Sequence, residues 1–138
     1  MVKLKKRKIK KRILEKWAKE ALSFLDLKGV ELSIYITDDL EIQELNKVYR
    51  GKDGPTDVLS FPLNEIFNGY KILGDIVISQ DTAERQAKEL GHTLEEEVRR
   101  LLVHGIIHLL GYDHEKSSEE EKKFYSLERY VLSKIRKT

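Results

Sequence analysis

The segment that decides the fold is residues 104–114, which reads HGIIHLLGYDH. Its first two histidines are four residues apart, so on a helix their imidazoles lie on one face, one turn apart. Gly111 comes three residues after His108 and can adopt the left-handed conformation that ends a helix and turns the chain back. The spacing therefore predicts that His104, His108 and His114 meet around one metal ion.

The donor set indicates which metal this is. Three neutral imidazoles leave the double charge of a zinc ion in place and its fourth tetrahedral position open for water, as in catalytic zinc sites. The chain has no cysteine, which excludes a thiolate cluster, a disulfide framework and a nucleophilic thiol. We expect one zinc ion, although imidazole also suits other divalent transition metals such as nickel or manganese. His92 lies before this segment and is interpreted as a surface residue.

The same spacing, His-x-x-x-His-x-x-Gly-x-x-His, is the frame of the metzincin proteases. Their general base is the glutamate directly after the first histidine, and that position holds Gly105 here. Without this carboxylate the usual peptidase mechanism fails. Glycine inside a helix costs about 1 kcal/mol relative to alanine, so we expect something to need the space: a closely packed backbone or a bulky substrate at the metal.

Outward from this segment, the apolar periodicity predicts an α+β fold with a small mixed sheet covered by about five helices, including a zincin-like ligand helix followed by the glycine turn. Strands are expected at residues 31–37, 58–63 and 71–79. The second contains Pro62, which places it at an edge, and the third is apolar on both faces and therefore central. Helices are expected at residues 13–25, 38–50, 81–90, 93–110 and 117–135. The length suits a single domain, residues 1–138.

The charge is distributed unevenly. The first twelve residues carry eight cations and no acid, although the whole chain has a net charge of +2. Such a block attracts polyanions such as RNA or DNA, and the alternative is a solvated terminal strand or helix start. No apolar signal-peptide core follows it, and the longest apolar stretch, residues 101–112, is too short to span a bilayer. We expect a cytoplasmic protein without membrane association.

The segment HGIIHLLGYDH also resembles the signature of the YbeY family of bacterial rRNA-maturation endoribonucleases, with Ile107 where the family usually has leucine. Leu45, Asn46 and YRGKDGPTDVLSFP at residues 49–62 resemble a second family stretch, and LGDIVIS at residues 73–79 a third. The resemblance runs from about the first helix to the end of the chain. It implies a zinc-dependent, single-strand-specific endoribonuclease that acts in maturation of small-subunit rRNA and in ribosome assembly. The implied partners are RNA, the small ribosomal subunit, and a ribosomal protein or assembly factor.

Arg50 stands where the resemblance places an arginine implicated in ribonuclease activity. Its guanidinium can bind a phosphate through two hydrogen bonds and offset charge that develops in the transition state. The alternative is an exposed cation favoured by the dipole at a helix C-terminus. Asp57, Asp75 and Asp113 are expected near the site, as acceptors for an imidazole N–H or a proton, or as turn caps, and none is assigned a catalytic role.

The expected reaction is phosphodiester hydrolysis, in which zinc polarises the phosphate or activates water and Arg50 offsets the growing charge. Attack by the ribose 2′-hydroxyl is equally allowed, and the basic N-terminal arm and Lys52 would guide the strand. Two rival hypotheses belong to other classes. One is a ribosome-assembly factor that binds RNA or protein and has a structural metal, and the other is a metzincin-like metallopeptidase whose base comes from elsewhere in the fold.

Overall fold

The computed structural model describes residues 1–135, so residues 136–138 of the expected domain lie outside the described part of the chain. It confirms the α+β architecture. The strands are β1 (Val2–Leu4), β2 (Val30–Thr37), β3 (Val58–Phe67) and β4 (Tyr70–Ser79), and the helices are α1 (Lys11–Phe24), α2 (Asp39–Arg50), α3 (Gln80–Leu90), α4 (Leu94–Leu109) and α5 (Ser118–Lys134).

The four strands form one mixed sheet in the order β1-β2-β4-β3. β1 and β4 both pair with β2 in parallel, whereas β3 and β4 form an antiparallel hairpin. As expected, β4 is internal and the Pro62-containing strand β3 lies at an edge. The hairpin is longer than expected because the strands continue to a two-residue turn. Asn68 and Gly69 form this turn at φ 49° and 82°, the left-handed pair that such turns need.

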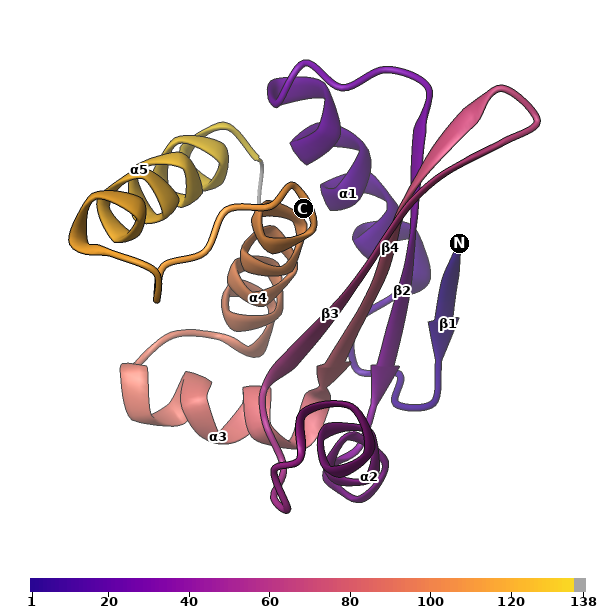
Figure 1. Cartoon of the computed structure of the whole chain (residues 1–138). Coiled ribbons are helices and arrows are strands. Elements are labelled where there is room, and N and C mark those ends of the chain that lie inside the picture. The colour runs from indigo at the N-terminus through magenta and orange to yellow at the C-terminus, as the bar shows by residue number, and fades with distance from the viewer. Residues whose placement is uncertain (136–138) are drawn as a thin grey trace.

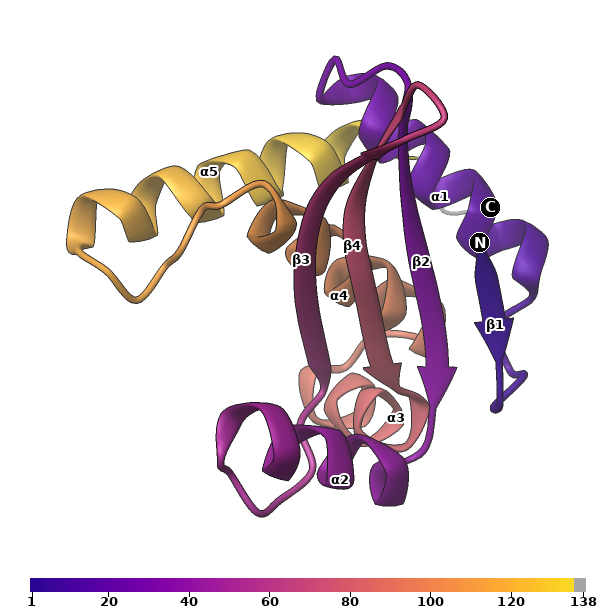
Figure 2. The same ribbon diagram turned by 45° about the vertical axis from the view of Figure 1, so that its right-hand side comes forward.

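The helices are distributed unequally over the two faces of the sheet. α1, α3, α4 and α5 lie on one face, and α2 lies across one end of the other face (Figure 1, Figure 2). The main core fills the first side and includes Trp17 and Phe124, whereas Ile42 of α2 packs with Leu59 and Val77 in a smaller cluster on the second side. None of the helices in residues 1–135 is long and apolar enough to cross a bilayer.

The basic N-terminal segment is part of the fold rather than a free arm. β1 pairs with β2, and the apolar side chains of Val2 and Ile9 are buried. Three of its lysines make ion pairs with acidic side chains of the body, so the terminal-strand alternative describes this segment better. These pairs are Lys5–Asp38 at 3.2 Å, Lys6–Asp81 at 3.6 Å and Lys8–Glu84 at 2.8 Å.

α4 begins and ends where the sequence indicates. Thr93 and Glu96 form a capping box at its start, and after Leu109 the chain turns at Gly111, whose φ is +98°. Within α4, a Cβ on Gly105 would lie 2.9 Å from Cγ2 of Ile76 in β4. The helix-interior glycine is therefore explained by close packing of α4 on the sheet, the first of the two explanations considered for it.

Candidate metal centre

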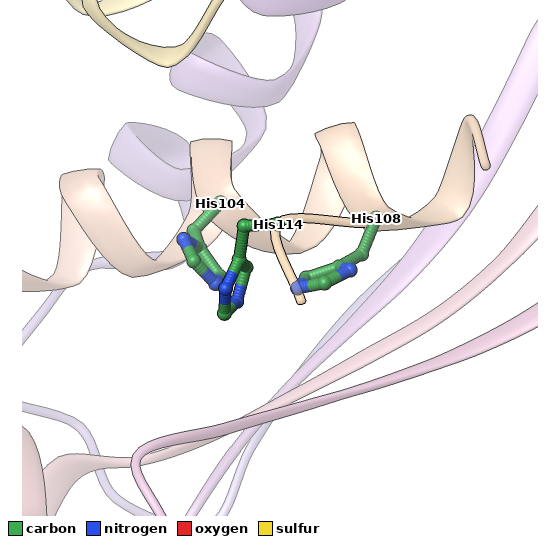
Figure 3. A group of neighbouring side chains, drawn as sticks. All are labelled: His104, His108 and His114. Atoms are coloured by element: carbon green, nitrogen blue, oxygen red, sulfur yellow. The ribbon is translucent and has the colours of Figure 1, made fainter. Parts of the chain in front are cut away.

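Three imidazoles converge at the end of α4. His104 and His108 project from the helix, and His114 returns to them from the following turn (Figure 3). One ring nitrogen of each can be chosen so that all three lie within 4.8 Å of one another. The ring centroids are 4.9 Å apart for His104 and His108, and 5.4 and 5.3 Å from these to His114.

The turn that delivers His114 depends on local backbone hydrogen bonds. The Gly111 N–H donates to the His108 carbonyl at 3.0 Å, which closes the last helical turn. After the left-handed Gly111, the Asp113 carboxylate accepts from the Glu115 N–H at 2.9 Å. Asp113 thus holds the turn around His114, which is the turn-capping alternative considered for it.

α5 supplies two side chains that back the histidines and that the sequence reasoning missed. The buried Phe124 ring packs against all three imidazoles, with centroid distances of 4.7 Å to His104, 4.8 Å to His108 and 5.1 Å to His114. One turn later, Oε2 of Glu128 lies 2.8 Å from Nδ1 of His104. In the sequence, this role is indicated only by the spacing: Glu128 follows Phe124 by four residues and therefore lies on the apolar face of α5.

The surroundings favour an uncharged imidazole at His108. Burial lowers the pKa of His108, and the neighbouring His104 and His114 lower it further. These effects outweigh Asp113 and a hydrogen bond to the Tyr112 backbone, both of which raise this pKa. A neutral imidazole keeps a lone pair for a metal at neutral pH, as a ligand must.

The donor set fits one zinc ion. Zinc–nitrogen bonds of about 2.0–2.1 Å at tetrahedral angles place ligand nitrogens about 3.4 Å apart. Nitrogens within 4.8 Å of one another reach such spacing with small ring movements. His104 has Nδ1 engaged with Glu128, which leaves Nε2 to face the other two rings. A group of three nitrogen donors is the composition of an open, catalytic type of zinc site.

The imidazoles lie in a hollow of about 560 Å³ between α4, the edge strand β3 and the end of α2. Arg50, exposed at the C-terminus of α2, lines the same hollow, so the structure brings it together with the three histidines. The other charged residues of the lining are acids: Asp57, Asp113 and Glu115. One cation and three carboxylates therefore surround the hollow before any metal binds.

Asp75 does not line this hollow, so the expectation that it lies near the site is wrong. Successive side chains of a strand point to opposite faces. Ile76 of β4 faces α4, so its neighbour Asp75 points to the other side, between its register partners Ser33 and Phe61. There it lines a second hollow of about 470 Å³.

Asp57 has a structural role at the rim. One oxygen accepts from the Val58 N–H at 2.7 Å, where β3 begins, and the other accepts from the Gln86 side chain at 3.3 Å. His92, interpreted from sequence as a surface residue, is mostly covered in the structure. Its Nε2 lies 2.7 Å from the buried carboxylate of Glu97, and its side chain is only 24% exposed.

Comparison with known proteins agrees with this geometry. Residues 2–136 match the model of the family described as Endoribonuclease YbeY. An Endoribonuclease YbeY from Aquifex aeolicus is 74% identical over 137 residues, which cover 99% of this chain and 91% of that protein. The one from a Sulfurihydrogenibium species is 50% identical over 130 residues, covering 94% and 86%. The solution structure of TM1509 from Thermotoga maritima superposes with a TM-score of 0.67 at 31% identity, covering 98% of this chain and 89% of that one. The chain therefore belongs to the YbeY family of endoribonucleases.

Proposed function

We propose that this chain is a zinc-dependent, single-strand-specific endoribonuclease of the cytoplasm that acts in maturation of small-subunit rRNA and in ribosome assembly. Membership of the YbeY family supports RNA cleavage by hydrolysis. The observation that carries the metal dependence is the convergence of three imidazoles within a hollow that also contains Arg50.

His104, His108 and His114 would hold the ion. When bound, zinc supplies a Lewis acid that polarises a phosphate oxygen and activates water. Arg50 lines the same hollow, where its planar guanidinium would bind the scissile phosphate through two hydrogen bonds and offset the charge that develops in the transition state. Lys52, in the loop that follows α2, would guide the strand by contacting its sugar–phosphate backbone.

Two structural observations favour this proposal over its rivals. A structural zinc site is closed by four protein ligands, whereas the ligand group found in residues 1–135 contains three imidazoles and opens into the hollow. A metzincin has its catalytic carboxylate directly after the first ligand, and here Gly105 packs at that position against Ile76 and Ser60 of the sheet, so a peptidase would have to recruit its base from another part of the fold.

The experiment that tests the proposal measures bound zinc and cleavage of a labelled single-stranded RNA for the wild type, His114→Ala and Arg50→Ala. We expect His114→Ala to lose both zinc and cleavage. Arg50→Ala should retain zinc and cleave about 10²–10³-fold more slowly, the usual effect of removing one transition-state donor. Arg129→Ala, which removes an exposed arginine of α5 that does not line the hollow, is the control and should behave as the wild type.

The possible outcomes separate the hypotheses. Full cleavage by a zinc-free His114→Ala variant would refute the metal-dependent mechanism. An unstable His114→Ala together with a fully functional Arg50→Ala would favour the assembly factor with a structural metal. Cleavage of unstructured polypeptide that is indifferent to added RNA would favour the peptidase.

A further inference from the structure

We infer that Glu128 is a positioning residue of the metal centre, which fixes the proton on Nδ1 of His104 and so directs the Nε2 lone pair of that ring to the ion. The inference rests on the metal site proposed above and extends it to α5. Metal-binding histidines commonly donate their second ring N–H to a carboxylate, a carbonyl or water, which orients the ring and makes it a better ligand. Glu128 has the position and the chemistry for this role.

The contacts of His104 leave its imidazole little freedom. Oε2 of Glu128 lies 2.8 Å from Nδ1, and a carboxylate oxygen accepts, so Nδ1–H is the donor. The free lone pair is then on Nε2. The Phe124 ring packs on the same imidazole at a centroid distance of 4.7 Å and an interplanar angle of 64°. One residue sets the tautomer and the other limits rotation of the ring.

The location of Glu128 is hard to explain by packing alone. It is only 7% exposed and lies on the buried face of α5 with Phe124 and Val131. An apolar side chain at this place would avoid the cost of removing a carboxylate from water. The carboxylate instead meets Nδ1 of His104 at 2.8 Å. A leucine at this place would leave that ring nitrogen without its carboxylate partner.

The other ligand on α4 is oriented differently. The ring of His108 packs against Phe124 at a centroid distance of 4.8 Å, without a carboxylate on either ring nitrogen among the hydrogen bonds of residues 1–135. Among the described residues, Glu128 is the carboxylate that the structure places on a ring nitrogen of the triad. A change at Glu128 should therefore act on one ligand and weaken metal binding without removing a ligand atom.

The test compares Glu128→Gln and Glu128→Ala with the wild type, and Glu121→Gln serves as the control because it removes an exposed carboxylate from the same helix. Zinc affinity is measured by competition with a chromophoric chelator. In the zinc-free protein, nitrogen NMR shifts of the imidazoles report which ring nitrogen of His104 carries the proton. Thermal unfolding without metal shows whether each variant is folded.

We expect Glu128→Ala to bind zinc about 10–100-fold more weakly than the wild type and Glu128→Gln to fall between the two, since loss of such a partner has effects of this size. His104 should be protonated on Nδ1 in the wild type and lose this preference in Glu128→Ala, while Glu121→Gln changes neither property. Wild-type zinc affinity in both Glu128 variants, or an unchanged tautomer in Glu128→Ala, would overturn the role of Glu128. Failure of the wild type to bind zinc would instead overturn the proposed metal site, so the two failures are distinguishable.

Discussion

A single residue, Gly105, distinguishes the ligand segment of this chain from that of a metzincin protease. A Cβ at this position would lie 2.9 Å from Cγ2 of Ile76 and 3.2 Å from Oγ of Ser60, and that hydroxyl donates to the Gly105 carbonyl at 3.3 Å. The position where a metzincin carries its catalytic glutamate is thus used to bring α4 against the sheet. Any carboxylate that accepts a proton in the reaction must come from another part of the hollow.

Gly105→Ala should lower the free energy of unfolding by up to about 2 kcal/mol. Overpacking a buried site typically costs about 1–3 kcal/mol, and alanine returns about 1 kcal/mol in helix propensity. Urea denaturation measures the difference. Gly54→Ala is the matched control because Gly54 has no positive φ and no atom within 4 Å of an added Cβ, so its stability should be unchanged or slightly raised. Equal stability of the Gly105→Ala and Gly54→Ala proteins would contradict the packing explanation.

Gly111→Ala should lower both stability and zinc affinity. Alanine at the observed φ of +98° is strained by about 1–2 kcal/mol, and relief of this strain moves the turn that carries His114. Gly91→Ala is the matched control, since Gly91 ends α3 at φ +73° and lies outside the metal centre. Urea denaturation and chelator competition should show a similar loss of stability in both variants but weaker zinc binding only in Gly111→Ala. Equal zinc affinity in the two would show that the turn does not position His114.

The residues that could be predicted from sequence are those whose geometry is local. His104 and His108 share a helix, and His114 follows through a glycine turn, so their convergence needs no knowledge of the rest of the fold. Phe124 and Glu128 reach the same place only because α5 packs across α4, a tertiary contact that spacing does not reveal. The error for Asp75 had a similar cause, since the sequence did not show which face of β4 meets α4.

At the scale of elements, a polar network joins α3 to α4. The Glu97 carboxylate is fully buried in α4 and is held by Arg100 at 2.6 Å, by the Gln86 side chain of α3 at 2.6 Å and by His92 of the connecting segment at 2.7 Å. Gln86 also donates to Asp57 at the rim of the hollow, at 3.3 Å. The network therefore links the start of the ligand helix to the edge of the site.

Glu97→Gln should lower the free energy of unfolding at pH 7 by about 2–4 kcal/mol, because it leaves the partly exposed Arg100 without its anionic partner. Burial raises the pKa of Glu97, but Arg100 and the other hydrogen-bond donors outweigh burial and hold this pKa below its ordinary value of 4.5. The stabilisation is thus fully present above about pH 4.5 and is lost as the pH falls through the lower folded-state value.

Urea denaturation of the wild type and Glu97→Gln at several pH values between 7 and 3 measures this effect. The difference in stability should be constant from pH 7 to about pH 5 and shrink below pH 4.5. Glu89→Gln, which removes an exposed carboxylate near the end of α3, should follow the wild type at every pH. A difference that grows with acidification would contradict the assigned direction of the Glu97 pKa.

The elements with clear periodicity and end signals were predicted correctly, and the errors have identifiable causes. α4 has both a capping box and a glycine stop, and its observed ends agree with the expected ones to within a residue. β1 was considered only as the alternative of a solvated terminal strand, because the cations that follow Val2 suggested a segment outside the core. The extent of β3 was underestimated because Asn64 suggested a loop, whereas it adopts φ 52° at an irregularity within the strand.

At the scale of the whole molecule, the charges are not arranged as a simple RNA-binding site would have them, with free cations around the site. The net charge is +2, yet three of the N-terminal lysines are committed to ion pairs with the body. The hollow itself has Arg50 facing Asp57, Asp113 and Glu115. The charged side chains of the hollow therefore do not by themselves attract an anionic strand. A divalent ion bound to the histidines would supply the balancing positive charge.

RNA binding should consequently depend on metal even where no bond is cleaved. We expect zinc-loaded protein to bind a labelled, cleavage-resistant single-stranded RNA about 3–10-fold more tightly than protein treated with a chelator, at low salt, where two added charges act with little screening. Fluorescence anisotropy measures both affinities, and the ratio should fall as salt is raised. His114→Ala is the control for zinc acting on the RNA itself, because adding zinc to this variant should leave its affinity unchanged. Equal RNA affinity of the zinc-loaded and the chelator-treated wild type at low salt would show that the acidic lining does not limit RNA binding. Cations outside the hollow would then have to bind the strand.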